Sequence, residues 1–316
     1  MPLSSLKKKI SDKKYSVAFG EVVKINATVI TARGLKVSIS DIVKIISNDT
    51  AQETIGMVTE IDGSTFFITP FSFVEGFCSG DRVFLDQTGL NIPVSSALLG
   101  RVVDPFMRPI DGKGNINSPH LSPIIKAPIP AMKRGMIDKV FSVGVKSIDG
   151  LLTCGKGQKL GIFAGSGVGK STLMGMIVRG ADAPIKVVAL IGERGREVPE
   201  FIEKNLGGNL ENTVIIVATS DDSPLMRKYG AFAAMSVAEF FKDQGLDVLF
   251  IMDSVTRFAM AQREIGLALG EPPTSKGYPP SSLTLLPQLM ERAGKEEGKG
   301  SITAFFTVLI EGDDMS

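Results

Sequence analysis

The residues with the clearest chemical content lie at positions 160–172, which read LGIFAGSGVGKST. An apolar run is followed by a loop with three glycines, and Lys170 and Ser171 stand directly before an apolar-periodic segment. Glycines let consecutive backbone N–H groups turn inward on a phosphate, the lysine reaches the β- and γ-phosphates, and the serine hydroxyl ligates Mg²⁺. The stretch therefore predicts a phosphate-binding loop between a strand and a helix. Ala164 stands where the usual pattern has its first glycine, a change of one methyl group.

Two acidic residues stand at the ends of apolar runs further along the chain. Asp253 follows residues 248–252, where a P-loop enzyme places the carboxylate that helps to hold Mg²⁺. Its alternative role is the N-cap of the helix that follows. Glu193 follows another apolar run and can orient and polarise the water that attacks the γ-phosphate. With the glycine loop, these carboxylates predict a site for hydrolysis of a nucleotide.

Two arginines adjoin these carboxylates in the sequence. Arg194 can offset charge that develops on the phosphates, or it can form an ordinary surface ion pair with Glu193 or Glu197. Arg257 lies one helical turn beyond Asp253, so the two can face the same side of a helix. Arg257 can thus stabilise the carboxylate or the phosphates, or it can form a structural salt bridge, and the sequence leaves both interpretations open.

The composition excludes other kinds of chemistry. The 316 residues carry a net charge of +1, with 43% hydrophobic and 22% charged residues, so they show no general preference for nucleic acid. His120 is the only histidine, which excludes a Ser-His-Asp triad and histidine-rich metal sites. Cys78 and Cys154 lack metal-ligand spacing, and we expect reduced thiols in a cytoplasmic protein. We expect no membrane span, because no run of about 18 apolar residues occurs. We also expect no signal peptide, because the lysines at 7–9 are not followed by an apolar run.

The first third of the sequence indicates a basic N-terminal segment followed by a small β domain. Residues 1–16 form a basic N-terminal segment with five lysines, which reads as a frayed helix or as a docking site for a partner or an anionic membrane surface. Residues 17–92 predict a small β barrel or sandwich, because short alternating runs are separated by turn residues. The expected strands lie at 22–32, 35–40, 42–47, 54–61, 64–71 and 82–86.

Four phenylalanines occur close together in this β region. They are interpreted as core residues rather than as a platform for stacking bases, because they lie within strand-like runs. These residues are Phe66, Phe67, Phe71 and Phe73.

The rest of the chain, residues 93–316, predicts an α/β domain that follows a boundary near Pro93. After a connector rich in Pro and Gly at 93–142, fully apolar strands alternate with helices, which indicates a mostly parallel sheet covered on both faces. Ligands of such sheets bind at the carboxyl ends of the strands. The expected strands lie at 160–164, 186–194, 212–220, 248–254 and 302–310, and the expected helices at 199–206, 227–245 and 256–269.

Residues 269–286 hold four prolines and Gly277. We therefore expect neither a regular helix nor a central strand there, but a long functional loop. Glu291 and Arg292, which follow this segment, are interpreted as residues that reach a neighbouring subunit.

Taken together, these residues resemble the flagellar and type III secretion export ATPases, which are relatives of the catalytic subunit of rotary ATP synthases. The wording LLTCGKGQ at 151–158 and the basic N-terminal segment favour the flagellar branch. Residues 17–92 match the family's N-terminal barrel in pattern only. The matching stretches lie at 98–112, 144–173, 190–201, 222–241, 249–282 and 286–294.

The resemblance implies an α/β P-loop NTPase domain of the RecA-like type with a mostly parallel sheet, preceded by a small all-β barrel. It implies a homohexameric ring that hydrolyses ATP to ADP with Mg²⁺ and supports protein export. Lys170, Glu193 and Arg194 would be catalytic, and Ser171 and Asp253 would hold the metal. The nucleotide would be held by Ala164, Gly165, Ser166, Gly167, Val168, Gly169, Lys170, Ser171, Thr172 and Arg257.

The resemblance also implies partners and a place in the cell. The basic segment 1–16 would contact a stator or regulator protein, and the ring would meet export-gate proteins, chaperones and export cargo, but no nucleic acid. The protein would be cytoplasmic, with a peripheral contact at the inner face of the membrane. The loop at 269–282 would line the central channel of the ring.

The chain stops at Ser316, before the place where the family has a helical C-terminal domain and an arginine that is supplied to the neighbour's active site. We therefore expect a C-terminally truncated form that binds ATP or ADP but forms no stable ring. Its hydrolysis should be very slow, because an arginine finger is worth ~10³–10⁵ in rate.

Three alternative functions remain. One is the ATPase of a virulence-type secretion system. Another is a non-catalytic nucleotide-binding subunit, against which Glu193 argues, because the non-catalytic relatives carry an uncharged residue at the matching place. The last is a ring-shaped RNA translocase, which would need a basic or aromatic face on the barrel.

Overall fold

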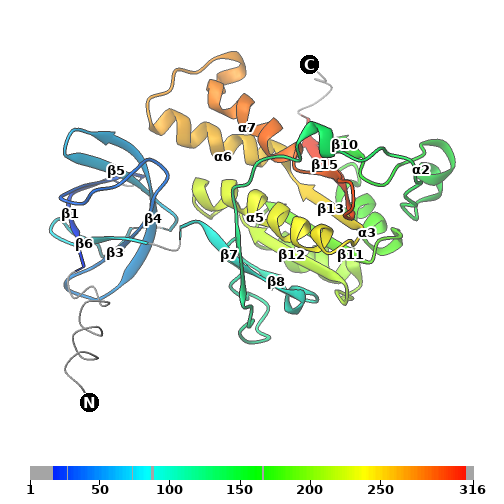
Figure 1. Ribbon diagram of the computed structural model, residues 1–316, viewed down its shortest axis with the longest axis horizontal. Coiled ribbons are helices and arrows are strands. Elements are labelled where there is room, and N and C mark those ends of the chain that lie inside the picture. The colour runs from blue at the N-terminus through cyan, green and yellow to red at the C-terminus, as the bar shows by residue number, and fades with distance from the viewer. Residues whose placement is uncertain (1–16, 27, 73, 87–88, 166, 311–316) are drawn as a thin grey trace, which may run out of the picture. The chain divides into compact units, whose positions relative to one another are not determined.

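The computed structural model describes residues 17–26, 28–72, 74–86, 89–165 and 167–310 (Figure 1). The chain divides into two compact units between Gly89 and Leu90, whereas the sequence placed the boundary at 92/93. The expected basic segment 1–16 lies outside the described residues. Within the described part of the chain, no helix combines the length and the apolar character that a bilayer span requires.

The first unit is a closed barrel of antiparallel strands in the order β1-β2-β5-β4-β3-β6, in which β6 pairs back onto β1. Buried and half-buried residues alternate along β5, as expected for a strand with one face in a core. The strands are β1 (Gly20–Ile25), β2 (Ile30–Arg33), β3 (Ile42–Ile46), β4 (Glu53–Asp62), β5 (Thr65–Pro70) and β6 (Arg82–Leu85).

Two of the expected strands differ from the structure. The run at 22–32 is not one strand but the hairpin of β1 and β2, closed where the backbone N–H of Asn26 donates to the Val29 carbonyl at 2.9 Å. The run at 35–40 is not a strand, because the Asp41 carboxylate accepts the Ser38 N–H at 2.7 Å and turns the chain. The expected number of strands is thus reached with a different division of the sequence.

The core of the barrel is formed by aliphatic side chains together with Phe66 and Phe77. Phe66 and Phe71 are buried, as expected for core residues, and Phe67 is half-buried. Phe73 lies outside the described residues. Neither Phe66 nor Phe71 is therefore available to stack on a base.

The second unit holds a parallel sheet in the order β10-β15-β13-β11-β12-β8, with β14 added antiparallel to β15, and a separate pair of β7 and β9. An α/β domain with a mostly parallel sheet after a barrel is thus confirmed. The strands are β7 (Asn91–Val94), β8 (Val102–Val103), β9 (His120–Pro123), β10 (Lys159–Ala164), β11 (Ile185–Ile191), β12 (Thr213–Ala218), β13 (Val248–Asp253), β14 (Gly294–Lys295) and β15 (Ser301–Leu309).

Helices cover both faces of this sheet (Figure 1). Alternate residues of the central strands, such as Val188 and Leu190, pack with α3 and α4, while Ile191 faces α5, where Gly230 allows close approach. The helical elements are η1 (Ser96–Leu98), η2 (Ala131–Lys133), α2 (Lys146–Leu151), α3 (Lys170–Gly180), α4 (Glu197–Glu200), η3 (Phe201–Asn205, a π-helical turn), α5 (Pro224–Asp243), α6 (Val255–Ala268), η4 (Ser275–Gly277) and α7 (Pro280–Met290).

The prediction that residues 269–286 contain no regular helix is wrong for its last part. Helix α7 begins at Pro280, where a missing N–H costs nothing because the first-turn N–H groups have no intrahelical partner. It continues through Pro287. Only the residues before Pro280 form the expected loop.

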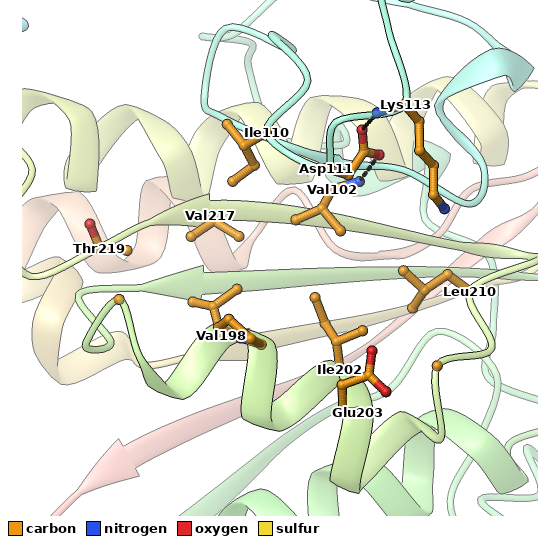
Figure 2. A pocket seen from close by; sticks show the side chains of 13 residues that line it. Val102, Ile110, Asp111, Lys113, Val198, Ile202, Glu203, Leu210, Val217 and Thr219 are labelled. Carbon is orange, nitrogen blue, oxygen red and sulfur yellow. Dashed lines mark hydrogen bonds between the residues drawn. The ribbon is translucent and has the colours of Figure 1, made fainter.

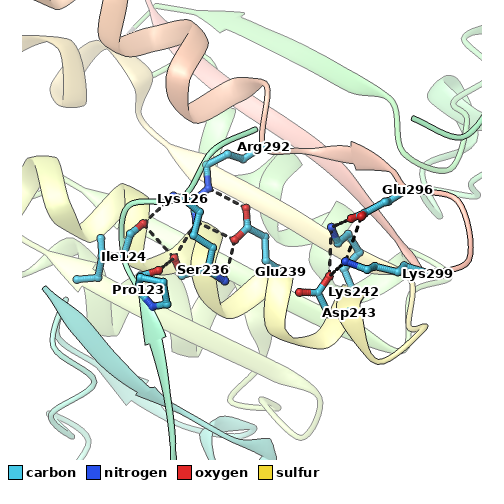
Figure 3. Close-up of polar contacts among 10 residues, drawn as sticks. All are labelled: Pro123, Ile124, Lys126, Ser236, Glu239, Lys242, Asp243, Arg292, Glu296 and Lys299. Carbon is cyan, nitrogen blue, oxygen red and sulfur yellow. Dashed lines mark hydrogen bonds and ion pairs between the residues drawn. The ribbon is translucent and has the colours of Figure 1, made fainter. Parts of the chain in front are cut away.

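The interpretation that Arg292 reaches a neighbouring subunit is also wrong. Its side chain is fully buried within this chain and forms two hydrogen bonds to Glu239 of α5, at 2.7 and 2.8 Å (Figure 3). It also donates to the Ile124 carbonyl and to Ser236 Oγ. Glu291 binds Arg134 and Lys159 of the same chain. Arg292 therefore ties the end of α7 and the segment after β9 to α5.

Candidate active site

The glycine loop joins β10 to α3, as the sequence predicted. Ala164 is the last residue of β10, and Lys170 is the first residue of α3. Gly167 and Gly169 have φ angles of 76° and 94°, which a residue with a Cβ rarely adopts. Ser171 and Thr172 are exposed in the first turn of α3. The N–H groups of that turn point out of the helix start, where an anion is favoured by the unpaired N–H groups and the helix dipole.

Lys170 joins this loop to the two predicted carboxylates. Its Nζ donates to Oδ1 of Asp253, which ends β13, and lies 3.6 Å from Oε1 of Glu193, which follows β11. The three side chains are 5 to 18% exposed. Strands β11 and β13 are paired neighbours and parallel, so their carboxyl ends meet at the same edge of the sheet. The structure thus brings Lys170, Glu193 and Asp253, which are far apart in sequence, into one cluster.

Asp253 is held from a third strand. The hydroxyl of Thr307, a fully buried residue of β15, donates to Asp253 Oδ1 at 2.7 Å. The alternative role of Asp253 as a helix N-cap falls to Ser254, whose side chain accepts the N–H of Arg257 at 3.3 Å. The Asp253 carboxylate therefore faces Lys170 and Thr307 instead of capping α6.

The environment raises the pKa of Glu193 to about 7. Burial is the largest cause, and the negative charge of Asp253 adds to it, while Lys170 acts in the opposite direction. A carboxyl with a pKa near neutral pH is suited to accept a proton from water, because it is close to the pH at which it must act. The glycine loop, this carboxyl and Lys170 can together bind a phosphate chain and activate a water molecule beside it.

The two arginines differ in where they lie. The aliphatic stem of Arg257 packs against Gly192, where any Cβ would come within 2.6 Å of Arg257 Cβ. Its Nε is buried without a hydrogen-bond partner among the described residues, and its Nη1 contacts Met260 Sδ at 3.7 Å. Arg194 is exposed, and its Nη1 lies 3.4 Å from Glu197 Oε1, one of the pairings that the sequence left open. The structure does not join Arg194 to the Lys170 cluster.

The oxygen donors beside the loop fit a magnesium ion. Ser171 offers a hydroxyl, and Asp253 offers a carboxylate. Mg²⁺ is commonly bound by one or two protein oxygens together with phosphates and water. The described residues contain no cluster of three or more His, Cys, Asp or Glu side chains of the kind that transition metals use.

Sequence reasoning missed two threonines that position the site. Thr307 binds Asp253, and Thr256 Oγ1 accepts the backbone N–H of Leu309 at 2.8 Å, which fixes the start of α6 against β15. The signal for Thr307 was a polar residue inside the apolar run ITAFFTVLI. A buried hydroxyl in such a strand needs a hydrogen-bond partner, and here the partner is the predicted metal ligand.

A RecA-like parallel sheet with this loop and these carboxylates defines a P-loop nucleotide hydrolase. The chain belongs to the ATP synthase alpha/beta family, whose nucleotide-binding-domain model matches residues 144–316. It is therefore an ATP-hydrolysing enzyme, and the resemblance inferred from the sequence is confirmed.

The chain is similar to proteins of two export systems. It is 68% identical over 317 residues to the flagellum-specific ATP synthase of Helicobacter pylori strain J99, covering all of this chain and 73% of that protein. It is 46% identical to the type 3 secretion system ATPase of Xanthomonas euvesicatoria, covering 93% of this chain and 67% of that protein. Among solved structures, the assembled ATPase EscN of enteropathogenic E. coli, in complex with its central stalk EscO, is 45% identical with a TM-score of 0.85, covering 92% of this chain and 71% of that one.

Proposed function

We propose that this chain is the ATPase of a flagellar protein-export apparatus and that it hydrolyses ATP in a homohexameric ring. The observation that carries the proposal is the placement of Glu193 3.6 Å from Lys170 at the mouth of the glycine loop. The flagellar branch is favoured over a virulence-type system because the flagellum-specific relative is 68% identical and the type 3 secretion relative 46%. A ring is supported by the assembled state of the EscN relative.

Each residue of the site takes a separate role in this proposal. The backbone of residues 164–169 and the first turn of α3 bind the phosphates of ATP, and Lys170 moves from Asp253 to the β- and γ-phosphates. Ser171 and Asp253 hold Mg²⁺, which supplies charge neutralisation at the phosphates when it is bound. Glu193 polarises the attacking water and accepts its proton.

The arginines complete the proposed site. Arg257 has a buried Nε without a partner among the described residues, and in this proposal a phosphate of the nucleotide or a neighbouring carboxylate accepts its hydrogen bond. Arg194, which is exposed, would reach the phosphates only after leaving Glu197.

The proposed partners follow from the relatives. A stalk protein is supported by the EscO complex of EscN. A stator protein at residues 1–16, export-gate proteins, chaperones and cargo remain proposals from the resemblance, as do the channel role of residues 269–282 and a cytoplasmic location with contact at the inner membrane face.

Turnover measured against protein concentration tests ring catalysis. For a chain extended past Ser316, the rate per subunit should rise cooperatively with concentration, because neighbouring subunits complete the site. A rate per subunit that is independent of concentration and equal in both chains would contradict ring catalysis. The slow turnover expected of the 316 residues stays a prediction that the same comparison checks.

Two alternative functions have direct tests. A filter-binding assay with single-stranded RNA at moderate salt tests the translocase, which the burial of Phe66 and Phe71 disfavours. A non-catalytic subunit would bind ATP without turnover even when assembled, whereas Glu193 beside Lys170 favours turnover.

A further inference from the structure

A cavity of about 540 Å³ lies away from the glycine loop, between the segment after β8, strand β12 and the helical pair α4–η3 (Figure 2). This volume is within the range of small-molecule sites in proteins, roughly 300–1,000 Å³. Its walls are mostly aliphatic, which suits a ligand with an apolar body. The aliphatic lining residues are Val102, Ile110, Val198, Ile202, Leu210 and Val217.

Most polar groups of the cavity already have partners. The Asp111 carboxylate accepts two hydrogen bonds from Arg101, which holds the pKa of Asp111 far below its usual range. Lys113 Nζ donates to the Gly100 carbonyl at 3.0 Å. Thr219 donates its hydroxyl to Asp222 at 3.0 Å. The Asp111 carboxylate and the Thr219 hydroxyl are therefore already engaged, whereas Lys113 remains an exposed ammonium group at the cavity.

Glu203 is different. Its carboxylate stands at the end of the cavity near Leu210 (Figure 2) and makes no hydrogen bond or ion pair with any residue that the structure describes. Glu200, one turn earlier, binds Lys204 at 2.7 Å and does not line the cavity. An aliphatic cavity with one free carboxylate at its end is complementary to a molecule with an apolar body and one cationic head.

Residues that line the cavity are connected to Glu193 of the candidate active site along the chain and by a backbone hydrogen bond. Gly195, two residues after Glu193, lines the cavity, and the chain then forms α4 and the π-helical turn η3 that carries Glu203. At the end of β12, the Ser220 N–H donates to the Glu193 carbonyl at 2.9 Å. A π-helical turn is less regular than an α-helix and frequently marks a functional position.

We propose that this cavity is a regulatory site for a small primary amine with an aliphatic body. Glu203 binds the ammonium group, and the aliphatic residues line the site that takes the apolar body of the amine. Occupation fixes α4 and η3 and so changes the placement of Glu193. This coupling rests on the proposed role of Glu193 in hydrolysis, whereas the binding does not.

Binding is tested on the purified chain with n-hexylamine, followed by the methyl resonances of Ile, Leu and Val. Shifts should be largest at the lining residues and should extend along α4 and η3 toward Glu193. Hexan-1-ol, which lacks the charge, should bind about three- to fivefold more weakly, the order of one partly exposed ion pair, and hexanoate should not bind measurably. Equal binding of all three, or the absence of shifts at the lining residues, would overturn the proposal.

Two matched variants test which carboxylate binds the ammonium group. Glu203→Gln should weaken hexylamine binding by about the same three- to fivefold, and Glu200→Gln should leave it unchanged. Both positions are exposed, so both variants should fold. Ile202→Phe, which places a ring in the cavity, should abolish binding without lowering the thermal midpoint. Hexylamine binding that Glu203→Gln does not weaken, or that Ile202→Phe leaves intact, would overturn the site.

Coupling is read from ATP turnover with and without hexylamine. The amine should change kcat and leave the KM for ATP unchanged, and Glu203→Gln should remove this response. Unchanged kcat at saturating amine would overturn the regulatory role. Glu193→Gln tests the proposed function separately from the amine site. If turnover survives this change, the proposed role of Glu193 in hydrolysis is refuted, whether or not the amine binds.

Discussion

Thr307→Val should weaken Mg²⁺-dependent hydrolysis as well as stability. The substitution replaces one hydroxyl by a methyl group of similar size at a position that is fully buried. It removes the 2.7 Å hydrogen bond that Thr307 donates to Asp253, while Lys170 still binds the same carboxylate. The backbone and the packing of β15 should remain as they are.

The magnitude follows from the kind of hydrogen bond that is lost. A hydrogen bond to a charged group contributes about 1.5–3 kcal/mol to the free energy of unfolding. At roughly 2–4 °C per kcal/mol for a domain of this size, the thermal midpoint should fall by about 3–12 °C. Residues that orient a metal ligand typically change metal affinity or activity by about 10- to 100-fold, so the Mg²⁺ concentration for half-maximal turnover should rise by that factor.

Thr303→Val on the same strand is the matched control. Its hydroxyl accepts the Gly157 N–H at 2.9 Å and is equally buried, but it does not contact Asp253. It should lower the thermal midpoint without changing the Mg²⁺ dependence, measured by titration of turnover at fixed ATP. If Thr307→Val and Thr303→Val shift the midpoint alike and neither changes the Mg²⁺ dependence, Thr307 does not orient the metal ligand.

Further predictions concern pH, the buried ion pair and one glycine. Because the pKa of Glu193 is raised to about 7, kcat/KM should rise with pH through neutrality. The free energy of unfolding should fall by on the order of 3 kcal/mol between about pH 4.5 and 7, because over this range the native state keeps a proton that the unfolded state has released. Glu193→Gln should remove that slope in denaturant titrations. Arg292→Met should lower the free energy of unfolding by about 3–5 kcal/mol in the same titrations, because it leaves the Glu239 carboxylate buried and poorly paired. Adding Glu239→Gln should recover part of that loss. An unchanged free energy of unfolding in the Arg292→Met variant would contradict this prediction. Gly192→Ala should lower the free energy of unfolding by about 1–3 kcal/mol and displace the Arg257 side chain. If Arg257 binds the nucleotide as proposed, the variant should bind nucleotide more weakly, and an affinity equal to that of the parent would contradict that role.

The sequence predicted the parts of the fold that depend on local pattern. Apolar strands such as β11 and β13 and the long helix α5 follow from runs of residues that are buried on both faces or at helical spacing. Ser223 and Pro224 mark the start of α5 as a cap and a first-turn proline do. The P-loop was predictable because its glycines, lysine and serine are adjacent in the chain.

The predictions that failed did so because the structure depends on contacts between distant residues, or because a residue type is compatible with two local structures. Alternation at 22–32 continues across the turn near Asn26, so the pattern alone does not reveal a hairpin. The two prolines at 279–280 read as loop residues, although the second is a favourable first residue of α7. The partner of Arg292, Glu239, lies 53 positions away, and no local signal distinguishes a buried arginine of this kind from an exposed one.

The candidate site was predictable in its members but not in its arrangement. Lys170, Glu193 and Asp253 each stand at a strand or helix end, which the motif identified. Their convergence depends on the order β15-β13-β11 in the sheet, which depends on tertiary pairing rather than on sequence spacing. For the same reason Thr307, 54 positions from Asp253, could not be assigned to the site.

The central claim is that Glu193 polarises the water for a nucleotide held by Lys170 and the glycine loop. The most direct measurement compares Glu193→Gln with the unaltered sequence, both in a chain extended past Ser316, for ATP binding by equilibrium titration and for turnover by phosphate release. We expect ATP affinity to be retained and turnover to fall by about 10²–10⁴, the usual contribution of a general base. Retained turnover, or loss of ATP binding with an intact fold, would contradict the claim.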